Sequence, residues 1–347
     1  MPENTASPLP YVSVVIPALN CRGDIEDCLA ALERQDYPRD RFEVIVADNG
    51  STDGTREYLK HSWAKLCLCP ERGRARALNA GLELASGEII CTTDMSCRAE
   101  SNWIRTIVED FADPTVGCVA GEIKLFDSAL RGRVIDFQRR ANYMSPMLAL
   151  QRKKIPFMPF ADGANASFRR KVFDEIGGFE SSFIKAADVE ICYRLFALTH
   201  YRILFDYRAL MWEPGEPSLG ALLHQRLRMG IGWNLMRMKY PLLYAESGSR
   251  SAQAIYWSCR AAVGEAGAFL FRNIQALFGR DRAANHDDNI RFLMSQVQSF
   301  GRVYGRWHLR RRGIAPTPLD ARAQLRLIAA GGVADRVVVR GEEATKP

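Results

Sequence analysis

Short apolar runs rich in β-branched residues alternate with amphipathic stretches through the first third of the chain. Four of these runs are VSVVIPAL (12–19), FEVIVAD (42–48), AKLCLC (64–69) and GEIICTTD (87–94). Such runs are typical of strands that are buried on both faces. The stretches 24–35 and 74–85 carry apolar residues at helical spacing. Strands that alternate with helices need crossover connections, so the sequence predicts an α/β fold with a mostly parallel sheet flanked by helices.

The pattern changes along the 347-residue chain, which is long enough for one large domain and an appendage. From residue 218 onward the apolar spacing predicts helices only. We therefore expect four parts: a flexible leader (1–10), an α/β domain (11–217), a basic helical extension (218–312) and a partly disordered tail (313–347).

Polar side chains stand at the carboxyl ends of three predicted strands. Asn20 follows the first strand, Asp48 ends the second and Asp94 ends the fourth. Ligands of parallel sheets collect at this edge. The sequence thus predicts a binding site built from three separate strand ends.

Cysteine usage and the length of apolar runs indicate the compartment. Nine cysteines are scattered without a CxxC pair, which is typical of reduced thiols and argues against a disulfide framework or a zinc site. The N-terminus lacks the features of a signal peptide, and no window of about 18 apolar residues predicts a spanning helix. We expect a cytoplasmic protein.

Positive charge is concentrated after residue 218, within a net charge of +7. The stretch 251–278 also carries a wide apolar stripe, which fits either packing on protein or contact with a membrane surface. The charge itself fits either an anionic partner or a merely solvated face. We expect peripheral association with anionic lipid at the inner face of the cell membrane. No nucleic-acid-binding motif accompanies the charge, so we expect no nucleic acid partner.

Six segments carry a family resemblance: VSVVIPALN, VIVADNGSTDGT, RGRARALNAGL, TTDMSC, GANASFRR and ADVEICYRL. In this order and spacing, over roughly 11–235, they resemble the family 2 glycosyltransferases, whose nucleotide-binding fold is called GT-A. The resemblance implies a nucleotide-sugar donor and a single displacement that inverts the anomeric carbon. No GxGxxG follows the first strand, which argues against a dehydrogenase.

The residues expected to bind the donor are Pro17, Asn20, Asp48, Asp53, Arg76 and Asp94. Asp48 resembles the aspartate with which the family reads the base. A uracil or thymine imide suits this carboxylate, so a UDP-sugar is favoured, although guanine also fits. Asp53 has a second interpretation as a helix cap. Arg72, Arg74 and Arg76 all fit a phosphate, and the resemblance favours Arg76 or its neighbourhood.

Asp188 in ADVEICYRL matches the aspartate that serves the family as general base. Such a base takes the proton of the acceptor hydroxyl as the bond to the diphosphate breaks. The glutamate that precedes this aspartate in the family is replaced by Ala187. Asp188 also fits a helix N-cap, and the two roles are compatible.

Asp94 matches the first position of the Asp-x-Asp motif, which in the family helps to hold a divalent cation, Mn²⁺ or Mg²⁺. Ser96 replaces the second aspartate, and a hydroxyl brings no charge to a hard cation. Glu213 stands where many relatives have a histidine, so one hypothesis takes Asp94, Ser96 and Glu213 as metal ligands, with Glu213 restoring the lost carboxylate. The alternatives are that arginines neutralise the leaving group without a tightly held metal, and that Glu213 is a surface residue.

Four residues are expected to contact the acceptor or the diphosphate: Asn165, Gln225, Arg228 and Trp233. Gln225 and Arg228 fit the Gln-x-x-Arg-Trp motif of processive synthases, but Met229 replaces its tryptophan. An aromatic residue there gives a growing glycan a stacking surface, so its loss favours a non-processive enzyme. Gln225 and Arg228 also fit a plain basic helix face, and Trp233 also fits a core residue.

These features predict an enzyme that moves one sugar to a hydroxyl of a cell-surface glycan or lipid-linked acceptor. The alternative is a catalytically weakened or non-catalytic module that keeps the fold and binds nucleotide-sugar. Ser96 and Ala187 support the alternative, whereas Asp48, Asp94 and Asp188 support the enzyme.

Overall fold

The computed structural model describes residues 9–126, 132–142, 145–146, 159–245, 282–329 and 336–341. Its centre is a nine-stranded sheet with the strand order β3-β2-β1-β4-β7-β6-β8-β5, in which β9 also pairs with β8. The strands are β1 (Val12–Ala18), β2 (Phe42–Asp48), β3 (Lys65–Leu68), β4 (Ile89–Thr93), β5 (Arg98–Ala99), β6 (Val116–Leu125), β7 (Asn165–Arg169), β8 (Arg202–Glu213) and β9 (Val337–Arg340). The helices are α1 (Arg22–Glu33), α2 (Thr55–Lys60), α3 (Arg74–Leu84), α4 (Trp103–Asp110), α5 (Arg133–Arg140), α7 (Arg170–Ile176), α8 (Ala187–Leu198), α9 (Leu219–Lys239), α10 (Pro241–Ala245), α12 (Arg282–Arg311) and α13 (Ala321–Ala329).

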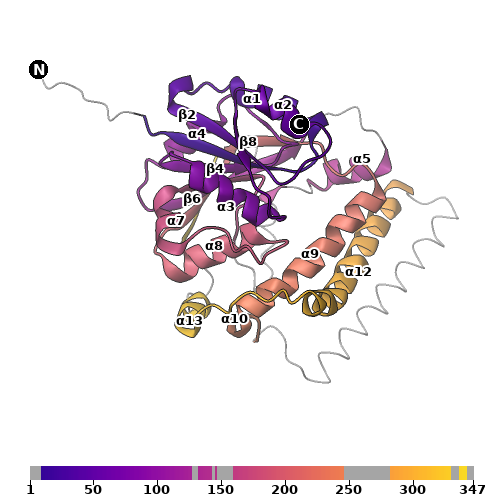
Figure 1. Ribbon diagram of the computed structural model, residues 1–347. Coiled ribbons are helices and arrows are strands. Elements are labelled where there is room, and N and C mark those ends of the chain that lie inside the picture. The colour runs from indigo at the N-terminus through magenta and orange to yellow at the C-terminus, as the bar shows by residue number, and fades with distance from the viewer. Residues whose placement is uncertain are drawn as a thin grey trace, which may run out of the picture.

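Most neighbouring strands run parallel, as the alternation of strands and helices predicts. β3, β2, β1 and β4 form one parallel set, with Val15 opposite Ile45 across β1 and β2. β6, β8 and β9 form a second parallel set. β7 lies antiparallel between β4 and β6 and joins the two sets. Parallel strands need crossover connections, and the helices that supply them cover both faces of the sheet (Figure 1).

Side chains on the strands alternate between two hydrophobic cores, one on each face of the sheet. Val14 packs in the core that includes α1 and α4, whereas Val15 packs in the core that includes α3, α7 and α8. Every residue of β1 and β2 is buried. Because both faces are covered, these strands have continuous apolar sequences rather than alternating ones.

The last helices pack outside the sheet. α9 and α12 lie side by side (Figure 1), and a Cβ built on Gly301 of α12 would lie only 2.5 Å from the carbonyl oxygen of Leu227 in α9. Asn234 of α9 donates a hydrogen bond to the Arg302 carbonyl oxygen (3.0 Å). The helices predicted after residue 218 are thus confirmed over 219–245 and 282–311. In the described part of the chain, no helix has both the length and the apolar character that a membrane crossing needs.

One strand lies in the tail (313–347) that the sequence predicts to be partly disordered. β9 pairs in parallel with β8, with Val337 opposite Ile203 and Arg340 opposite Asp206. The sequence interpretation missed this strand, which the short β-branched run VVVR forms at the edge of β8. The predicted apolar stripe at 251–278 lies outside the described residues, as do 1–8 and 342–347. The boundaries of the four expected parts remain a prediction.

Candidate active site

The buried carboxylate of Asp48 lies at the end of β2, where β1 and β2 pair up to their last residues. Pro17 is buried in β1 opposite Ala47. Asp48 accepts hydrogen bonds from the Ser51 backbone N–H (2.9 Å) and from Arg56 Nε (2.7 Å). Burial opposes ionisation, but the hydrogen bonds from Ser51 and Arg56 outweigh it and hold the pKa of Asp48 below its ordinary value. Asp48 is therefore a fixed anion at the position expected to read the base.

Asn20 and Asp53 shape the loop that follows β2. Asn20 adopts a left-handed backbone conformation with φ 51°, and its Oδ1 accepts a hydrogen bond from the Thr52 N–H (2.8 Å). Asp53 accepts hydrogen bonds from the backbone N–H groups of Arg22 at the start of α1 and Thr55 at the start of α2, both 3.0 Å long. Hydrogen bonds from Thr55 and Arg22 lower the pKa of Asp53 to about 2. The structure thus gives Asp53 the helix-capping role that the sequence offered as its second interpretation.

Asp94 and Arg74 form an ion pair at the end of β4. Arg74 Nε and Nη2 lie 3.2 Å and 2.6 Å from Asp94 Oδ1. Ser96 lies in the tight turn that follows, which the Cys97 N–H closes on the Asp94 carbonyl oxygen (3.0 Å). Arg76, which the resemblance favoured, instead forms an ion pair with Glu71 (3.1 Å). Arg74 is therefore the arginine that the structure brings to Asp94.

Asp188 lies in the first turn of α8 and is held by two backbone donors. Its Oδ2 accepts a hydrogen bond from the Gly163 N–H (3.1 Å), and its Oδ1 accepts one from the Val189 N–H (2.9 Å). Gly163 also contacts Arg74, because a Cβ built there would lie 2.7 Å from Arg74 Nη1. Ala186, just before α8, has φ 65°, a conformation that is costly for a residue with a Cβ. The backbone at Gly163 therefore joins the predicted base to the Arg74–Asp94 pair.

Two further carboxylates, Asp162 and Glu213, lie near Asp94 and Asp188, and we call these four residues the acidic site. Burial and the negative charges of Asp188 and Asp94 raise the pKa of Asp162 to about 6. Burial and the charges of Asp162 and Asp94 raise the pKa of Glu213 to about 8. Glu213 Oε2 is buried without a hydrogen-bond partner. The structure thus places Glu213 by the site as hypothesised, and it adds Asp162, which the sequence interpretation missed although it directly precedes the GANASFRR motif.

Positive charge from α9 faces this acidic site. Burial and the charges of Arg228 and Arg74 lower the pKa of Lys185, while Asp188 and Asp94 oppose the shift. α9 approaches closely here, since a Cβ on Gly232 would lie 3.0 Å from the Lys185 Cβ. Arg228 thus lies near Lys185, and its contact with the acceptor or the diphosphate stays a prediction. Gln225 lies one turn earlier on the same helix and is half-buried.

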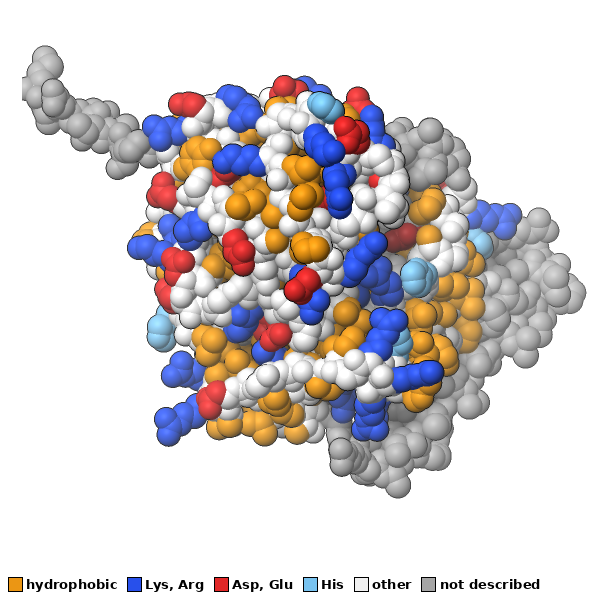
Figure 2. All heavy atoms as spheres, viewed as in Figure 1, with side chains coloured by type: hydrophobic (Ala, Val, Ile, Leu, Met, Phe, Trp, Pro, Cys, Tyr) orange, Lys and Arg blue, Asp and Glu red, His pale blue; other side chains and the backbone are white. Residues whose placement is uncertain are grey.

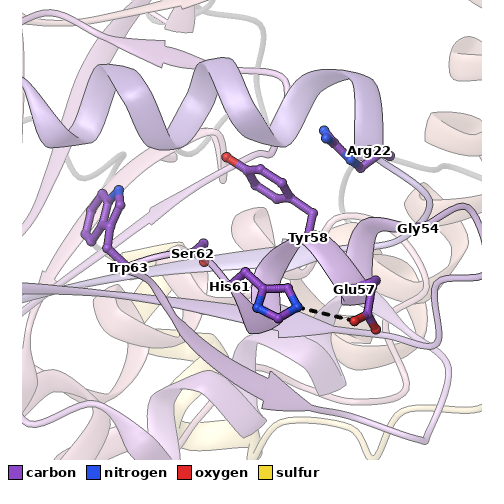
Figure 3. Close-up of a pocket in the computed structure, with 7 residues that line it drawn as sticks. All are labelled: Arg22, Gly54, Glu57, Tyr58, His61, Ser62 and Trp63. Carbon is purple, nitrogen blue, oxygen red and sulfur yellow. Dashed lines mark ion pairs between the residues drawn. The ribbon is translucent and has the colours of Figure 1, made fainter.

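A separate shallow pocket of about 540 Å³ lies between α1 and α2 (Figure 3). It is lined by Arg22, Gly54, Glu57, Tyr58, His61, Ser62 and Trp63. Its charged groups are already engaged: the Arg22 guanidinium lies 4.3 Å from the Tyr58 ring centroid, and His61 lies 3.4 Å from Glu57. None of the carboxylates of the acidic site lines this pocket.

Sequence comparison agrees with this geometry. The sequence model of the family described as Glycosyl transferase family 2 matches residues 13–177, which run from β1 through α7. Residues 13–177 therefore form a glycosyltransferase family 2 domain. The predicted family and enzyme class are confirmed.

Relatives of this glycosyltransferase include transferases and polymer synthases. It is 28% identical to Glycosyltransferase AglE of Haloferax volcanii, over 69% of this chain and 79% of AglE. It is 28% identical to Probable glycosyltransferase YdaM of Bacillus subtilis, over 67% of this chain and 57% of YdaM. It is 24% identical to Poly-beta-1,6-N-acetyl-D-glucosamine synthase of Staphylococcus epidermidis, over 67% of this chain and 59% of the synthase. The chain therefore spans less than two thirds of the length of the latter two relatives.

A solved structure confirms the GT-A fold of this glycosyltransferase. Mannosyltransferase PcManGT from Pyrobaculum calidifontis, solved in complex with GDP-Man and Mn²⁺, is similar with a TM-score of 0.53 and 22% identity. The similarity covers 93% of this chain and 79% of that one.

Two residues expected to contact the acceptor or the diphosphate have packing roles in this glycosyltransferase. Asn165 is 1% exposed, its Nδ2 donates to the carbonyl oxygens of Glu122 (2.9 Å) and Ala209 (2.8 Å), and its Oδ1 accepts from Trp103 Nε1 (2.8 Å). The expectation for Asn165 is wrong, because these partners engage both ends of its amide inside the sheet. Trp233 packs edge-on against Tyr244 with ring centroids 4.9 Å apart and lies 5.2 Å from the Arg302 guanidinium, which favours its core interpretation.

Proposed function

We propose that this glycosyltransferase moves one sugar from a nucleotide-sugar, with a UDP-sugar favoured, to a hydroxyl of a glycan or lipid-linked acceptor, with inversion at the anomeric carbon. One observation carries the proposal. Asp188 is held by the Gly163 N–H directly beside the Arg74–Asp94 pair, at the carboxyl edge of the sheet. This arrangement places a proton acceptor next to a site suited to the diphosphate end of a donor.

Asp188 is the proposed general base. As the acceptor oxygen forms its bond to the anomeric carbon, its proton passes to an Asp188 oxygen, and the bond from that carbon to the diphosphate oxygen breaks. The nucleoside diphosphate leaves with the electron pair of that bond. Hydrogen bonds from Gly163 and Val189 fix the orientation of the carboxylate before the acceptor arrives. Attack from the face opposite the leaving group gives inversion.

Three cationic side chains support departure of the diphosphate. Arg74 lies in the site itself, and Arg228 is close enough to Lys185 for its charge to help lower the pKa of Lys185. Cations that are fixed before the reaction stabilise charge that develops on a leaving group. Arg74 is the central one, because it also contacts Asp94.

A divalent cation, Mn²⁺ or Mg²⁺, fits beside Asp94 and Glu213. The buried Glu213 oxygen without a partner, and the mutual repulsion of Glu213, Asp94 and Asp162, are both features that a cation would relieve. In the described part of the chain no three His, Cys, Asp or Glu side chains are already gathered around one point, so donor oxygens would complete the ligand set. When bound, the cation would neutralise charge on the diphosphate. Ser96 contributes at most a neutral oxygen.

The base-reading position supports a UDP-sugar. Asp48 is buried and ionised, and its carboxylate accepts hydrogen bonds, as an imide N–H of uracil would require. In the free protein Arg56 occupies one of its oxygens, so donor binding would exchange or share this partner. GDP-mannose is the informative competitor, since PcManGT was solved with it.

Transfer of a single sugar and a cytoplasmic location complete the proposal. Met229, in place of the tryptophan of processive synthases, is 43% exposed on α9 and offers no flat ring to a growing glycan. Eight cysteines in the described residues are free and buried, as suits a reducing compartment.

Transfer activity distinguishes this enzyme from the alternative, a nucleotide-sugar-binding module, for which Ser96 and Ala187 are the supporting residues.

Thermal unfolding with UDP-, GDP- and dTDP-sugars, each with and without Mn²⁺, tests the proposal, because a ligand that binds only the folded state raises its stability. We expect a UDP-sugar with Mn²⁺ to give the largest rise in melting temperature. The stabilising donor is then radiolabelled and incubated with membrane glycolipids and oligosaccharides. Stabilisation without release of nucleoside diphosphate would favour the binding module, and stabilisation by no donor would overturn both interpretations.

A further inference from the structure

Helix α12 exposes large apolar side chains on the side that faces away from α9. Phe300, Val303 and Trp307 are 60%, 73% and 54% exposed. Their spacing of three and four residues puts them on one side of the helix, and we call these three residues the apolar stripe. Gly301 and Gly305, which make the close contacts with α9, lie on the opposite side. The stripe is therefore not explained by packing between the two helices.

Contacts within α12 hold the aromatic members of the stripe in place. The rings of Phe300 and Tyr304 are stacked, with centroids 5.9 Å apart and planes 12° apart. Trp307 packs against the same Tyr304, with the two ring centroids 5.6 Å apart. Because these rings support each other along the helix, the stripe is a preformed apolar surface.

Positive charge surrounds the apolar stripe. Residues 289–319 contain six arginines and no Asp or Glu. Helical spacing places Arg310 and Arg311 on either side of the stripe, and the Arg311 guanidinium lies 5.3 Å from the Trp307 ring centroid. Figure 2 shows Lys and Arg side chains among hydrophobic ones over the region where α9 and α12 lie. The matching partner surface must be both anionic and able to accept apolar groups.

We infer that this face of α12 docks the protein on an anionic lipid surface. The apolar stripe enters the boundary between headgroups and acyl chains, and the arginines beside it pair with lipid phosphates. A lipid surface satisfies both features, whereas a soluble polyanion would leave the stripe in water. The inference is independent of the proposed sugar transfer, and it gives the membrane association expected from the sequence a defined contact face.

Co-sedimentation of the full chain with vesicles tests the inference. We expect binding to phosphatidylcholine vesicles that contain phosphatidylglycerol, weaker binding in high salt, and little binding to phosphatidylcholine alone. Phe300→Ser with Trp307→Ser should weaken binding at least tenfold. Arg306 lies one turn before Arg310 on the same side of α12. Arg306→Glu with Arg310→Glu should weaken binding by more than about fivefold for each arginine, since each contributes about 1 kcal/mol near such a surface.

Matched controls separate this face from general surface effects. Leu84→Ser changes an apolar side chain of similar exposure, 53%, on α3. Arg322→Glu with Arg326→Glu makes the same change in net charge on α13. Both controls should bind vesicles like the unchanged protein. Circular dichroism and urea unfolding of each variant show that a loss of binding is not a loss of fold.

Quenching by bromine-labelled lipid supplies a second measurement that does not need a destabilising change. Trp307→Phe keeps an aromatic ring in the stripe, so it should still bind vesicles but lose a large part of the tryptophan quenching. The inference is overturned if neutral vesicles bind equally well, if the α12 variants bind like the controls, or if Trp307→Phe leaves the quenching unchanged. Binding that soluble polyphosphate abolishes, without any tryptophan quenching by lipid, would assign the face to a soluble polyanion instead.

Discussion

Arg74 places two guanidinium nitrogens on a single carboxylate oxygen of Asp94, with Nε at 3.2 Å and Nη2 at 2.6 Å from Oδ1. The lone acid of the incomplete Asp-x-Asp motif therefore already has a cationic partner in the free protein. Because the same guanidinium packs against Gly163, it also connects the donor end of the site to the loop that holds Asp188.

Replacing Arg74 should weaken donor binding. Arg74→Gln removes charge-assisted hydrogen bonds, whose individual worth of about 1.5–3 kcal/mol corresponds to roughly a tenfold to hundredfold rise in the donor Kd. Isothermal titration with the nucleoside diphosphate measures the change. Arg76→Gln, two residues away and paired with exposed Glu71, is the matched control and should leave the Kd within about twofold. Equal effects of the two replacements would contradict the assignment.

Replacing Asp188 should abolish transfer while sparing donor binding. Asp188→Asn keeps the shape of the side chain but cannot take a proton, so kcat should fall by about 10²–10⁴-fold. The donor Kd, measured separately, should stay nearly constant. Asp174→Asn on the exposed surface of α7 is the control and should keep full activity. A donor Kd that rises as steeply as kcat falls would show that Asp188 binds the donor instead of acting as a base.

Replacing Glu213 tests the restored-carboxylate hypothesis. Glu213→Gln keeps the volume of the side chain but removes the carboxylate that a cation would bind, so the donor should bind less tightly in Mn²⁺. Binding without metal should change little, because burial and neighbouring charges raise the pKa of Glu213 to about 8. Titrations of donor with and without Mn²⁺ give the metal response as a ratio of the two Kd values. An identical ratio in the unchanged protein and in Glu213→Gln would leave Arg74 as the main neutralising group and end the hypothesis.

Asn165 should matter for stability and not for binding. Asn165→Ala leaves the carbonyl oxygens of Glu122 and Ala209 and the indole N–H of Trp103 without their partner inside the sheet. We expect the free energy of unfolding to fall by about 2–4 kcal/mol, measured by urea titration. The exposed Asn102→Ala is the control. The prediction fails if Asn165→Ala unfolds like the unchanged protein and loses donor binding.

A buried acid pair away from the active site should give the fold a pH dependence. Burial and the charge of Asp206 raise the pKa of Asp110 to about 7, although Arg340 and Arg208 oppose the shift. The folded state then binds more protons than the unfolded state between about pH 4 and pH 7, so stability falls as pH rises through this window and levels off above it. In the unchanged protein the free energy of unfolding should fall by on the order of 1–2 kcal/mol over this window, after allowance for solvent screening. Asp110→Asn should remove most of this fall. Urea midpoints from pH 4 to pH 8 measure it, and an unchanged slope in Asp110→Asn would refute the pair as its source.

Much of the fold was predictable because its signals are local. β1 and β2 are covered on both faces, so burial alone fixes their continuous apolar sequence, and the polar residues that end strands had to meet at one edge of a parallel sheet. This reasoning found Asn20, Asp48 and Asp94, whereas Asp188, in the first turn of α8, was predicted only from the family resemblance. It did not find β9, whose partner β8 lies far away in the sequence.

The wrong predictions at the site concern residues whose contacts depend on the three-dimensional packing and cannot be read from the sequence. The register between β6 and β8 shifts after Gly121, which skips three residues of β8 and leaves backbone carbonyl groups for Asn165 to satisfy. Asn165, although it lies in a motif of the family resemblance, therefore uses its side chain to hydrogen-bond the backbone of the sheet. Likewise, Arg74 and Arg76 differ by about half a turn of α3, so only the placement of that helix decides which one meets Asp94.

The pairing of β9 with β8 has a consequence for synthesis of the protein on the ribosome. Arg336, at the start of β9, donates hydrogen bonds to the carbonyl oxygen of Tyr201, at the start of β8, and the two residues lie 135 positions apart. At translation rates of about 5–20 residues per second, the first half of β8 waits roughly ten seconds for its partner. During that time its backbone donors and acceptors form an open sheet edge that other chains can pair with. A chaperone that covers this edge should therefore raise the yield of folded protein most when translation is slow.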